Sequence, residues 1–340
     1  MLRYFCHNMN ENYRKYALVE LHLHLDGALS SEAIIEVAKK ENITLPTYNP
    51  RELDKYLIVP KDCKSLNEYL ERFDIPNLAL QTEFGLRTCT LDLLKRLAED
   101  GIKYAEIRMA PQLSTAGKLT QEEVVIILIN LLKIAEQLYG IKSNLILCCM
   151  RGAPKEKNRE TIEVARKYYG NGVVLLDFAG AEALFPNELY LDDFKLINSY
   201  NIPFTIHAGE ALGAESVKIA LENKARRIGH GTRSIEDEEV MNYLVSHKIP
   251  LELCPTSNID TKCIKDYKDM PMREYLDRGI MVTLSTDDPT VSNTTLKDEY
   301  YHLEHDMGLS KDDLYQIALN TINAAMISEN EKQSLRDILE

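Results

Sequence analysis

The stretch VELHLHLDG, residues 19–27, alternates in the manner of a β-strand that carries two imidazoles on one face. Because successive side chains of a strand point to opposite faces, His22 and His24 emerge together, while the leucines between them pack on the other side. By itself the pair fits two structural histidines at a strand end as well as two ligands of one metal ion. The choice depends on which other residues the fold brings to this strand end.

Outward from this stretch, the chain repeats a strand followed by a helix eight times. Short β-rich runs alternate with segments of helical periodicity, and Gly101, Gly140, Gly170 and Gly279 end four of the predicted helices. Eight such units favour an α/β fold of the (β/α)₈ TIM barrel type over an open doubly wound sheet. The expected strands cover residues 16–25, 102–110, 143–150, 172–178, 202–207, 226–230, 250–254 and 280–285, and the expected helices 31–41, 91–100, 120–139, 157–169, 191–200, 214–223, 235–246 and 270–278.

Residues 16–340 are predicted to form this barrel as a single domain, after a loose N-terminal lead-in over residues 1–15. The segment from about residue 30 to 90 is too long for a simple connection, so we expect a helical insertion after strand one. Such an insertion usually covers the active face of a barrel. Its Tyr69, Leu70 and Phe73 recur at helical spacing, and they either line a pocket or only pin the insertion to the barrel.

The composition favours some classes of binding partner over others. The 340-residue chain has a formal net charge of −13 and no cluster of lysine and arginine, which argues against nucleic acid and favours a small-molecule substrate. No apolar run approaches the roughly 20 residues of a membrane helix, and the first residues lack the apolar segment of a secretion signal. Seven cysteines without a Cys-x-x-Cys pair indicate free thiols in a reducing compartment, so we expect a cytoplasmic protein. The oligomeric state does not follow from the sequence.

Polar residues follow several predicted strands at the end where barrel enzymes carry out their chemistry. The motifs Gly-x-Gly-x-x-Gly and Walker A are absent, which weakens dinucleotide-binding and nucleotide-hydrolysing alternatives. In a barrel, the carboxyl ends of all strands meet at one mouth. The segments expected there are His22 to His24 after strand one, HAGE at 207–210 after strand five, GHG at 229–231 after strand six, and STDDP at 285–289 after strand eight.

A mononuclear metal centre accounts for this set. Three imidazoles and one carboxylate, from His22, His24, His207 and Asp287, provide the donors of a catalytic zinc site that keeps one position for water. A second metal would need a bridging ligand at the end of strand four, where only Asp177 lies three residues before Gly180. We therefore predict one Zn²⁺ per chain, although cobalt, iron or nickel would accept the same donors.

Three more residues at this mouth are candidates for acid–base work. Glu210 suits proton transfer, with a supporting contact to His207 as the alternative. His230, between two glycines, can orient a water molecule or hold developing charge, with a core or capping role as the alternative. Asp288, the third candidate, is expected to face the pocket.

The segments HLHLDG at 22–27, HAGE at 207–210, GHG at 229–231, CPTSN at 254–258 and STDDP at 285–289 resemble the adenosine/adenine deaminase family of the amidohydrolase superfamily. The resemblance covers nearly the whole barrel, in order and spacing. It implies a mononuclear zinc enzyme that converts a 6-aminopurine to the 6-oxo compound with release of ammonia. The other zinc deaminases use a His-x-Glu with Pro-Cys-x-x-Cys, and this chain has neither.

Carried over by position, the resemblance assigns the metal to His22, His24, His207 and Asp287, with His24 also at the substrate. Glu210 would give a proton to purine N1 and make C6 electrophilic, and His230 would align the zinc-activated water. Asp288 would meet N7, for which it must be protonated because N7 only accepts hydrogen bonds. The backbone N–H of Gly180 would meet N3.

Two positions bear on the substrate. The resemblance implies that Asp26 contacts ribose, where the free-base branch usually has Glu, so Asp26 favours adenosine or 2′-deoxyadenosine over adenine. After Gly180 the family often has Asp then Glu, whereas here Ala181 precedes Glu182. We expect an adenosine deaminase of purine salvage. The alternatives are a deaminase of adenine or of another 6-aminopurine nucleoside such as an aminofutalosine, and a metal-free, non-catalytic purine-binding protein on the same barrel.

Overall fold

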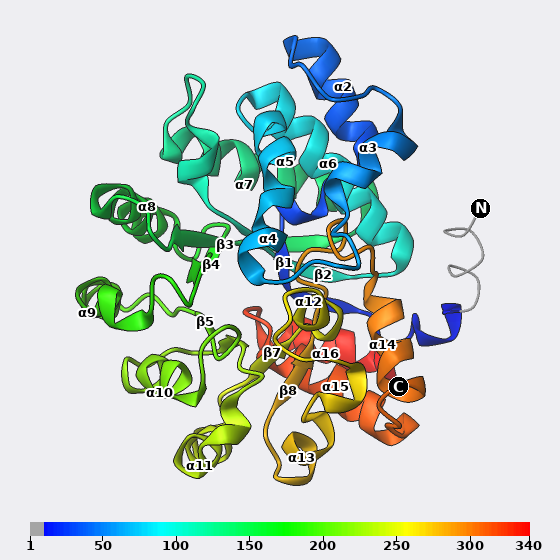
Figure 1. The fold of residues 1–340 in the computed structure, drawn as a ribbon, viewed down its shortest axis with the longest axis vertical. Coiled ribbons are helices and arrows are strands. Elements are labelled where there is room, and N and C mark those ends of the chain that lie inside the picture. Colours follow the sequence, from blue (N-terminus) through cyan, green and yellow to red (C-terminus); the bar gives the residue numbers. More distant parts are fainter. Residues whose placement is uncertain (1–9) are drawn as a thin grey trace.

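The structure, a computed structural model, describes residues 10–340. Eight parallel strands form a ring, with helices around it (Figure 1). The predicted (β/α)₈ barrel with a helical insertion after strand one is confirmed. The strands are β1 (Val19–His24), β2 (Tyr104–Met109), β3 (Lys142–Met150), β4 (Val173–Ala179), β5 (His207–Ala208), β6 (Ile228–His230), β7 (Leu251–Leu253) and β8 (Val282–Leu284).

The ring consists of two four-stranded ladders, β1 to β4 and β5 to β8, which single bridges join at both seams. Leu176 pairs with Phe204 between the ladders, and Leu23 pairs with Asp287 where β8 meets β1. Strands five to eight are all shorter than predicted, and β5 overlaps the predicted 202–207 only at His207. Pro203 has no N–H to donate, so its carbonyl only accepts, from the Leu176 N–H at 3.2 Å, and the Thr205 N–H donates to the Leu176 carbonyl at 2.9 Å.

Seven of the eight predicted helices lie within three residues of their predicted bounds, and one extends further. The helix predicted at 91–100 begins earlier, because the Thr82 hydroxyl accepts a hydrogen bond from the Gly85 N–H and caps it. The barrel helices are α2 (Ser31–Glu41), α6 (Glu83–Asp100), α7 (Gln121–Tyr139), α8 (Lys155–Tyr168), α9 (Leu191–Ser199), α10 (Ala214–Glu222), α11 (Glu238–His247) and α13 (Met272–Asp277).

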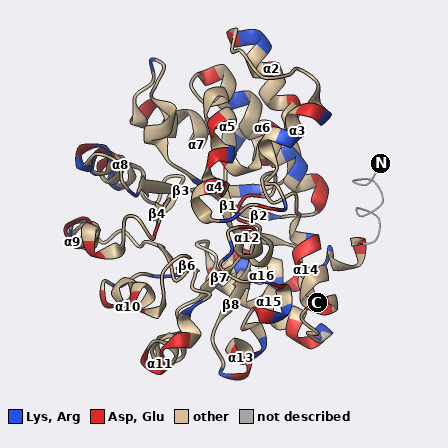
Figure 2. Ribbon diagram, viewed as in Figure 1, with Lys and Arg blue, Asp and Glu red and all other residues tan. Residues whose placement is uncertain are grey.

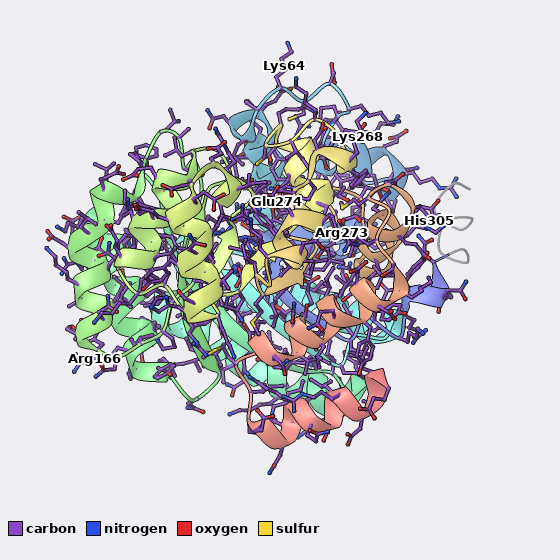
Figure 3. All side chains as sticks on the ribbon, turned by 90° about the horizontal axis from the view of Figure 1, so that it is seen from below. Lys64, Arg166, Lys268, Arg273, Glu274 and His305 are labelled. Atoms are coloured by element: carbon purple, nitrogen blue, oxygen red, sulfur yellow. The ribbon has the colours of Figure 1, made fainter. Side chains whose placement is uncertain are left out.

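Short helices of the insertion cover one end of the barrel. They are α3 (Pro50–Leu57), α4 (Leu66–Leu70), η3 (Glu71–Phe73) and α5 (Asp74–Ala79). In Figure 1, α4 lies over the centre of the ring, beside the short helix α12 (Pro255–Asp260) that follows β7. Lys64, in the loop before α4, extends from the edge of the molecule in Figure 3. The insertion therefore covers the mouth at which the strands end.

Helices that we did not predict follow β8. They are α14 (Leu296–His305), α15 (Lys311–Ala324) and α16 (Glu329–Leu339). Helix α15 packs on β8 and β1, so it covers the seam where the barrel closes. Thr295, Ser310 and Ser328 begin the three helices with capping boxes, a signal that is present in the sequence.

Of the predicted lead-in at residues 1–15, the first nine residues lie outside the described part. The rest is packed rather than loose, because Tyr13 is buried and its ring meets the edge of Tyr301 with centroids 6.2 Å apart. Acidic and basic residues are mixed on the outer helices, and Arg166 of α8 points outward (Figures 2 and 3). Within residues 10–340, no helix is long and apolar enough to cross a membrane. The six cysteines described there are free thiols.

Candidate active site

The seam between β8 and β1 brings three of the predicted metal ligands together. The N–H of His24 donates to the Asp287 carbonyl at 2.8 Å, and the N–H of Asp287 donates to the His22 carbonyl at 2.8 Å. Asp287 has a φ of 63°, a left-handed conformation that a residue other than glycine seldom adopts. Such strain concentrates at functional sites. The barrel closure thus sets the side chain of Asp287 against both histidines.

His207 at β5 completes a cluster of four donor atoms. Its Nε2 lies 3.1 Å from Nε2 of His22 and 3.2 Å from Nε2 of His24. Asp287 Oδ1 lies 3.2 Å from Nε2 of His22 and 3.3 Å from Nε2 of His24. Around a tetrahedral zinc ion with bonds of about 2.0–2.1 Å, donor atoms lie about 3.3 Å apart. Four of the six separations among the predicted donor atoms therefore match the spacing in a tetrahedral metal site.

The tautomers of two histidines support the same interpretation. His22 Nδ1 lies 3.0 Å from Glu252 Oε2, and His207 Nδ1 lies 3.0 Å from Asp177 Oδ2. A carboxylate only accepts, so each Nδ1 carries the proton and each Nε2 presents a lone pair. Two lone pairs 3.1 Å apart repel each other unless a cation lies between them. Carboxylates behind metal-binding histidines are the usual support of such sites.

A buried guanidinium links these two carboxylates. Arg108 donates from Nε to Asp177 Oδ2 at 3.0 Å, and its Nη2 bonds Glu252. Burial works to raise the pKa of Glu252, but Arg108 and then Arg227 outweigh it and hold this pKa well below its usual range. We did not predict these four residues as part of the site. In the sequence, the signal for these residues is a charged side chain within an otherwise apolar strand.

His230 differs from the other three histidines. Its Nδ1 lies 3.0 Å from Asn258 Nδ2, whose amide oxygen accepts from the Thr232 hydroxyl at 3.0 Å. The amide nitrogen donates, so the His230 proton is on Nε2. This atom is 3.6 Å from Glu210 Oε2 and 3.9 Å from Asp287 Oδ2, and within residues 10–340 it has no hydrogen-bond partner.

A second grouping of donors has to be weighed. Ligand atoms of His22, His207, His230 and Asp287 all lie within 4.8 Å of one another, so this grouping has His230 in place of His24. Because Nε2 of His230 carries a proton, it can donate to an oxygen but has no lone pair for a metal. The grouping with His24 is therefore chemically better suited to a cation, and His230 to a water molecule beside it.

Glu210 is buried in a loop that Glu182 holds. The Glu182 carboxylate accepts from the N–H groups of residues 209, 210, 211 and 212 at 2.7–3.2 Å, and from the Ser216 hydroxyl. Burial raises the pKa of Glu210, against the opposing effect of His230. A carboxyl with a raised pKa is suited to give a proton. From the sequence, Glu182 is only part of a departure from the family pattern, with no predicted role.

Replacing Glu182 with glutamine is expected to lower the free energy of unfolding by about 3 kcal/mol, because an amide N–H would face backbone N–H groups that now have an acceptor. Urea unfolding followed by circular dichroism measures this. The control is Glu239→Gln, at a side chain that is 82% exposed, where we expect a change below about 0.5 kcal/mol. Equal stability of the two variants would contradict this account of Glu182.

The remaining predicted residues line one pocket of about 230 Å³ beside the cluster. Asp26, Gly180 and Asp288 all border it, together with His24, Glu210 and His230. Gly180 has a φ of 105°, which favours glycine there. Tyr69, Leu70 and Phe73 of the insertion border the pocket too, so they line it as well as attach the insertion.

The family model and the curated relatives agree on one family. The family model described as "Adenosine deaminase" matches residues 17–340. An adenosine deaminase of Haemophilus ducreyi is 46% identical over 94% of this chain and 95% of its own length. One of Clostridium botulinum strain Okra is 42% identical over 96% and 97%. Among solved structures, the adenine deaminase of Arthrobacter aurescens has a TM-score of 0.85 and 28% identity over 95% of this chain and 97% of that one.

Proposed function

The chain belongs to the adenosine deaminase family, and from this we propose that it hydrolyses the C6 amino group of adenosine to give inosine and ammonia. The observation that carries the proposal is the arrangement at the barrel mouth, where a buried carboxyl, Glu210, lies beside the cluster of four metal-donor atoms. 2′-Deoxyadenosine differs only in the sugar, and we expect it to be a substrate as well.

We propose that His22, His24, His207 and Asp287 hold one zinc ion. The donor atoms of these residues are buried and close together, so their lone pairs would surround the positive charge of the ion. This supports the choice of ligands. When bound, zinc supplies a water nucleophile whose pKa is close to neutrality. Ser257 donates to Asp287 Oδ2 at 2.6 Å, which leaves Oδ1 to face the histidines.

Glu210 would move the proton on which the reaction depends. Proton donation from its carboxyl to purine N1 breaks the ring aromaticity and makes C6 open to attack by the water oxygen. The water oxygen adds to C6 while the ring electrons are taken up at protonated N1, and one proton of the water restores the Glu210 carboxyl. The remaining proton on that oxygen then moves to the amino group, the C6–N bond breaks, ammonia leaves and the C6=O bond forms. Burial raises the pKa of Glu210, which favours the protonated carboxyl that the first step uses.

His230 would orient the attacking water. Its Nε2–H faces the space between Glu210 and Asp287, where it has no partner within residues 10–340. A donor held there by Asn258 can bond the oxygen as it approaches C6 and stabilise the charge that develops on it.

Base and sugar contacts follow from the rest of the pocket. Burial, with Asp287 adding to it, raises the pKa of Asp288 well above its usual range, which supports a protonated carboxyl that donates to purine N7. The N–H of Gly180 would donate to N3. Asp26, which also lines the pocket, would accept from a ribose hydroxyl.

Asp26→Ala is expected to raise KM for adenosine by about 10- to 100-fold, because a hydrogen bond to a charged group contributes about 1.5–3 kcal/mol. The inhibition constant of hypoxanthine, which has no ribose, should change less than about twofold, since this variant leaves the base contacts intact. Steady-state kinetics with both compounds checks this. A parallel loss for nucleoside and base would contradict a ribose contact for Asp26.

The substrate itself is tested by parallel assays of adenosine, 2′-deoxyadenosine and adenine, with products separated by chromatography. We expect rapid formation of inosine and deoxyinosine and little or no hypoxanthine from adenine. Faster turnover of adenine would move the assignment to the activity named for the Arthrobacter structure. Purine binding without turnover, in protein that takes up no zinc when incubated with Zn²⁺, would favour the metal-free, non-catalytic alternative.

A further inference from the structure

Buried ion pairs cross the inside of the barrel and end at the metal-donor cluster. Arg227, the residue before β6, lies between two carboxylates: its Nη2 donates to Glu106 Oε2 at 2.6 Å, and its Nε lies 2.5 Å from Glu252 Oε1. Glu252 Oε2 is the atom that lies 3.0 Å from Nδ1 of His22, and these side chains are at most 1% exposed. Because β2 and β6 are not neighbours in the ring, Glu106 and Arg227 meet across its interior. Three contacts therefore lead from Glu106 to a proposed metal ligand.

The far end of this chain of contacts is held by the C-terminal helices. Glu106 Oε1 accepts from the Tyr104 hydroxyl at 3.1 Å and from the N–H of Met326, between α15 and α16, at 2.6 Å. Arg227 Nη1 donates to the carbonyl of Ala324, the last residue of α15, at 3.2 Å. The three groups that bond Glu106 all donate, so both of its oxygens are acceptors and its side chain is a carboxylate.

Glu106 gives the buried network its excess of negative charge. The guanidiniums of Arg108 and Arg227 face three carboxylates, those of Asp177, Glu252 and Glu106. Asp177 and Glu252 each hold a histidine of the cluster, whereas Glu106 bonds the network only through Arg227. Without Glu106, two positive and two negative charges would remain, and the network would be neutral. Inside a barrel, where the dielectric constant is low, such a change of one charge acts over a longer distance than in water.

We propose that Glu106 strengthens metal binding from the far end of the barrel, as a positioning residue that acts through Arg227 and Glu252. Its charge offsets that of Arg227, so Glu252 keeps more of its own charge for the Nδ1–H of His22. An imidazole whose N–H donates to a carboxylate is a more basic ligand at its other nitrogen. The proposal rests on the metal site proposed above, and it assigns a role to a residue that is neither a ligand nor part of the pocket lining.

The test measures the dissociation constant of Zn²⁺ for the full-length protein, by competition with a chromophoric chelator. For Glu106→Gln, which removes the charge and keeps the size of the side chain, we expect this constant to rise about tenfold. Tyr104→Phe is the matched control, because it removes a hydrogen bond of 3.1 Å to the same carboxylate but no charge. Its Zn²⁺ dissociation constant should stay within about twofold of the wild-type value. Both variants lose a buried hydrogen bond, so a purely structural role of Glu106 would weaken Zn²⁺ binding equally in both.

Arg227→Gln removes the opposite charge from the same ion pair, so the sign of its effect separates charge from packing. We expect this variant to bind Zn²⁺ about threefold more tightly than the wild type does. Weaker or unchanged binding by Arg227→Gln would overturn the proposal, as would an unchanged dissociation constant for Glu106→Gln or equal weakening by Glu106→Gln and Tyr104→Phe. If Glu106→Gln does not fold, the sign of the change in Arg227→Gln decides the question alone.

The wild-type protein separates this proposal from the metal site on which it rests. Wild-type protein that takes up no Zn²⁺ contradicts the metal site and with it the deaminase function. Wild-type protein that binds one Zn²⁺ as tightly as the Glu106 and Arg227 variants do contradicts only the role of Glu106.

Discussion

Glu210→Gln is expected to lower kcat for adenosine by about 10³-fold or more while the zinc content stays at one ion per chain. Glutamine keeps the size of the side chain but has no carboxyl proton, and positioned acid–base groups contribute about 10²–10⁴ in rate. Glu210 is not among the four proposed ligands, so metal binding should not change. Stopped assays with inosine quantified by chromatography, together with elemental analysis, measure both quantities.

The control for this variant is Glu215→Gln, at an exposed residue that follows the same strand. It should retain wild-type kcat. A Glu210→Gln protein with more than about a tenth of the wild-type rate would mean that another group delivers the proton to N1. Loss of zinc together with activity would instead mean that Glu210 supports the metal, which is the alternative that the sequence left open.

Removal of the metal is expected to abolish turnover and to lower the midpoint of thermal unfolding. Without a cation, the Nε2 atoms of His22 and His207 face each other at 3.1 Å in a buried site. A ligand present at about 1,000 times its dissociation constant stabilises the folded state by about 4 kcal/mol, and chelation removes that contribution. Dialysis against dipicolinate followed by calorimetry and activity assays tests this, and one equivalent of Zn²⁺ should restore both properties.

A pair of histidine variants localises the effect. His207→Ala should lose zinc and activity, whereas His247→Ala, at an exposed residue of α11, should lose neither. Full activity after exhaustive chelation, with zinc below a tenth of an equivalent by elemental analysis, would contradict the metal-dependent account.

The sequence predicted the barrel and the mouth of the site because both depend on local patterns. Alternation of apolar residues sets the strands, and residues that follow parallel strands in a barrel meet at one end, so His22, His207 and Asp287 could be brought together without coordinates. The helices after β8 were missed although Thr295, Ser310 and Ser328 signal their starts.

Residues that act through another side chain could not be predicted in the same way. Arg108 is read from the sequence as a charge in an apolar strand, and its role appears only when β4 and β7 bring Asp177 and Glu252 to it. Glu106 acts through Arg227, which the closed ring brings to it from the residue before β6. Local periodicity does not specify such long-range contacts.

Anomalous scattering at the zinc absorption edge, from crystals of protein purified without chelator, tests the central claim most directly. We expect one peak per chain, about 2.0–2.2 Å from Nε2 of His22, His24 and His207 and from an Asp287 oxygen, with His230 outside bonding distance. A peak elsewhere in the chain, or one that bonds His230 in place of His24, would contradict the account.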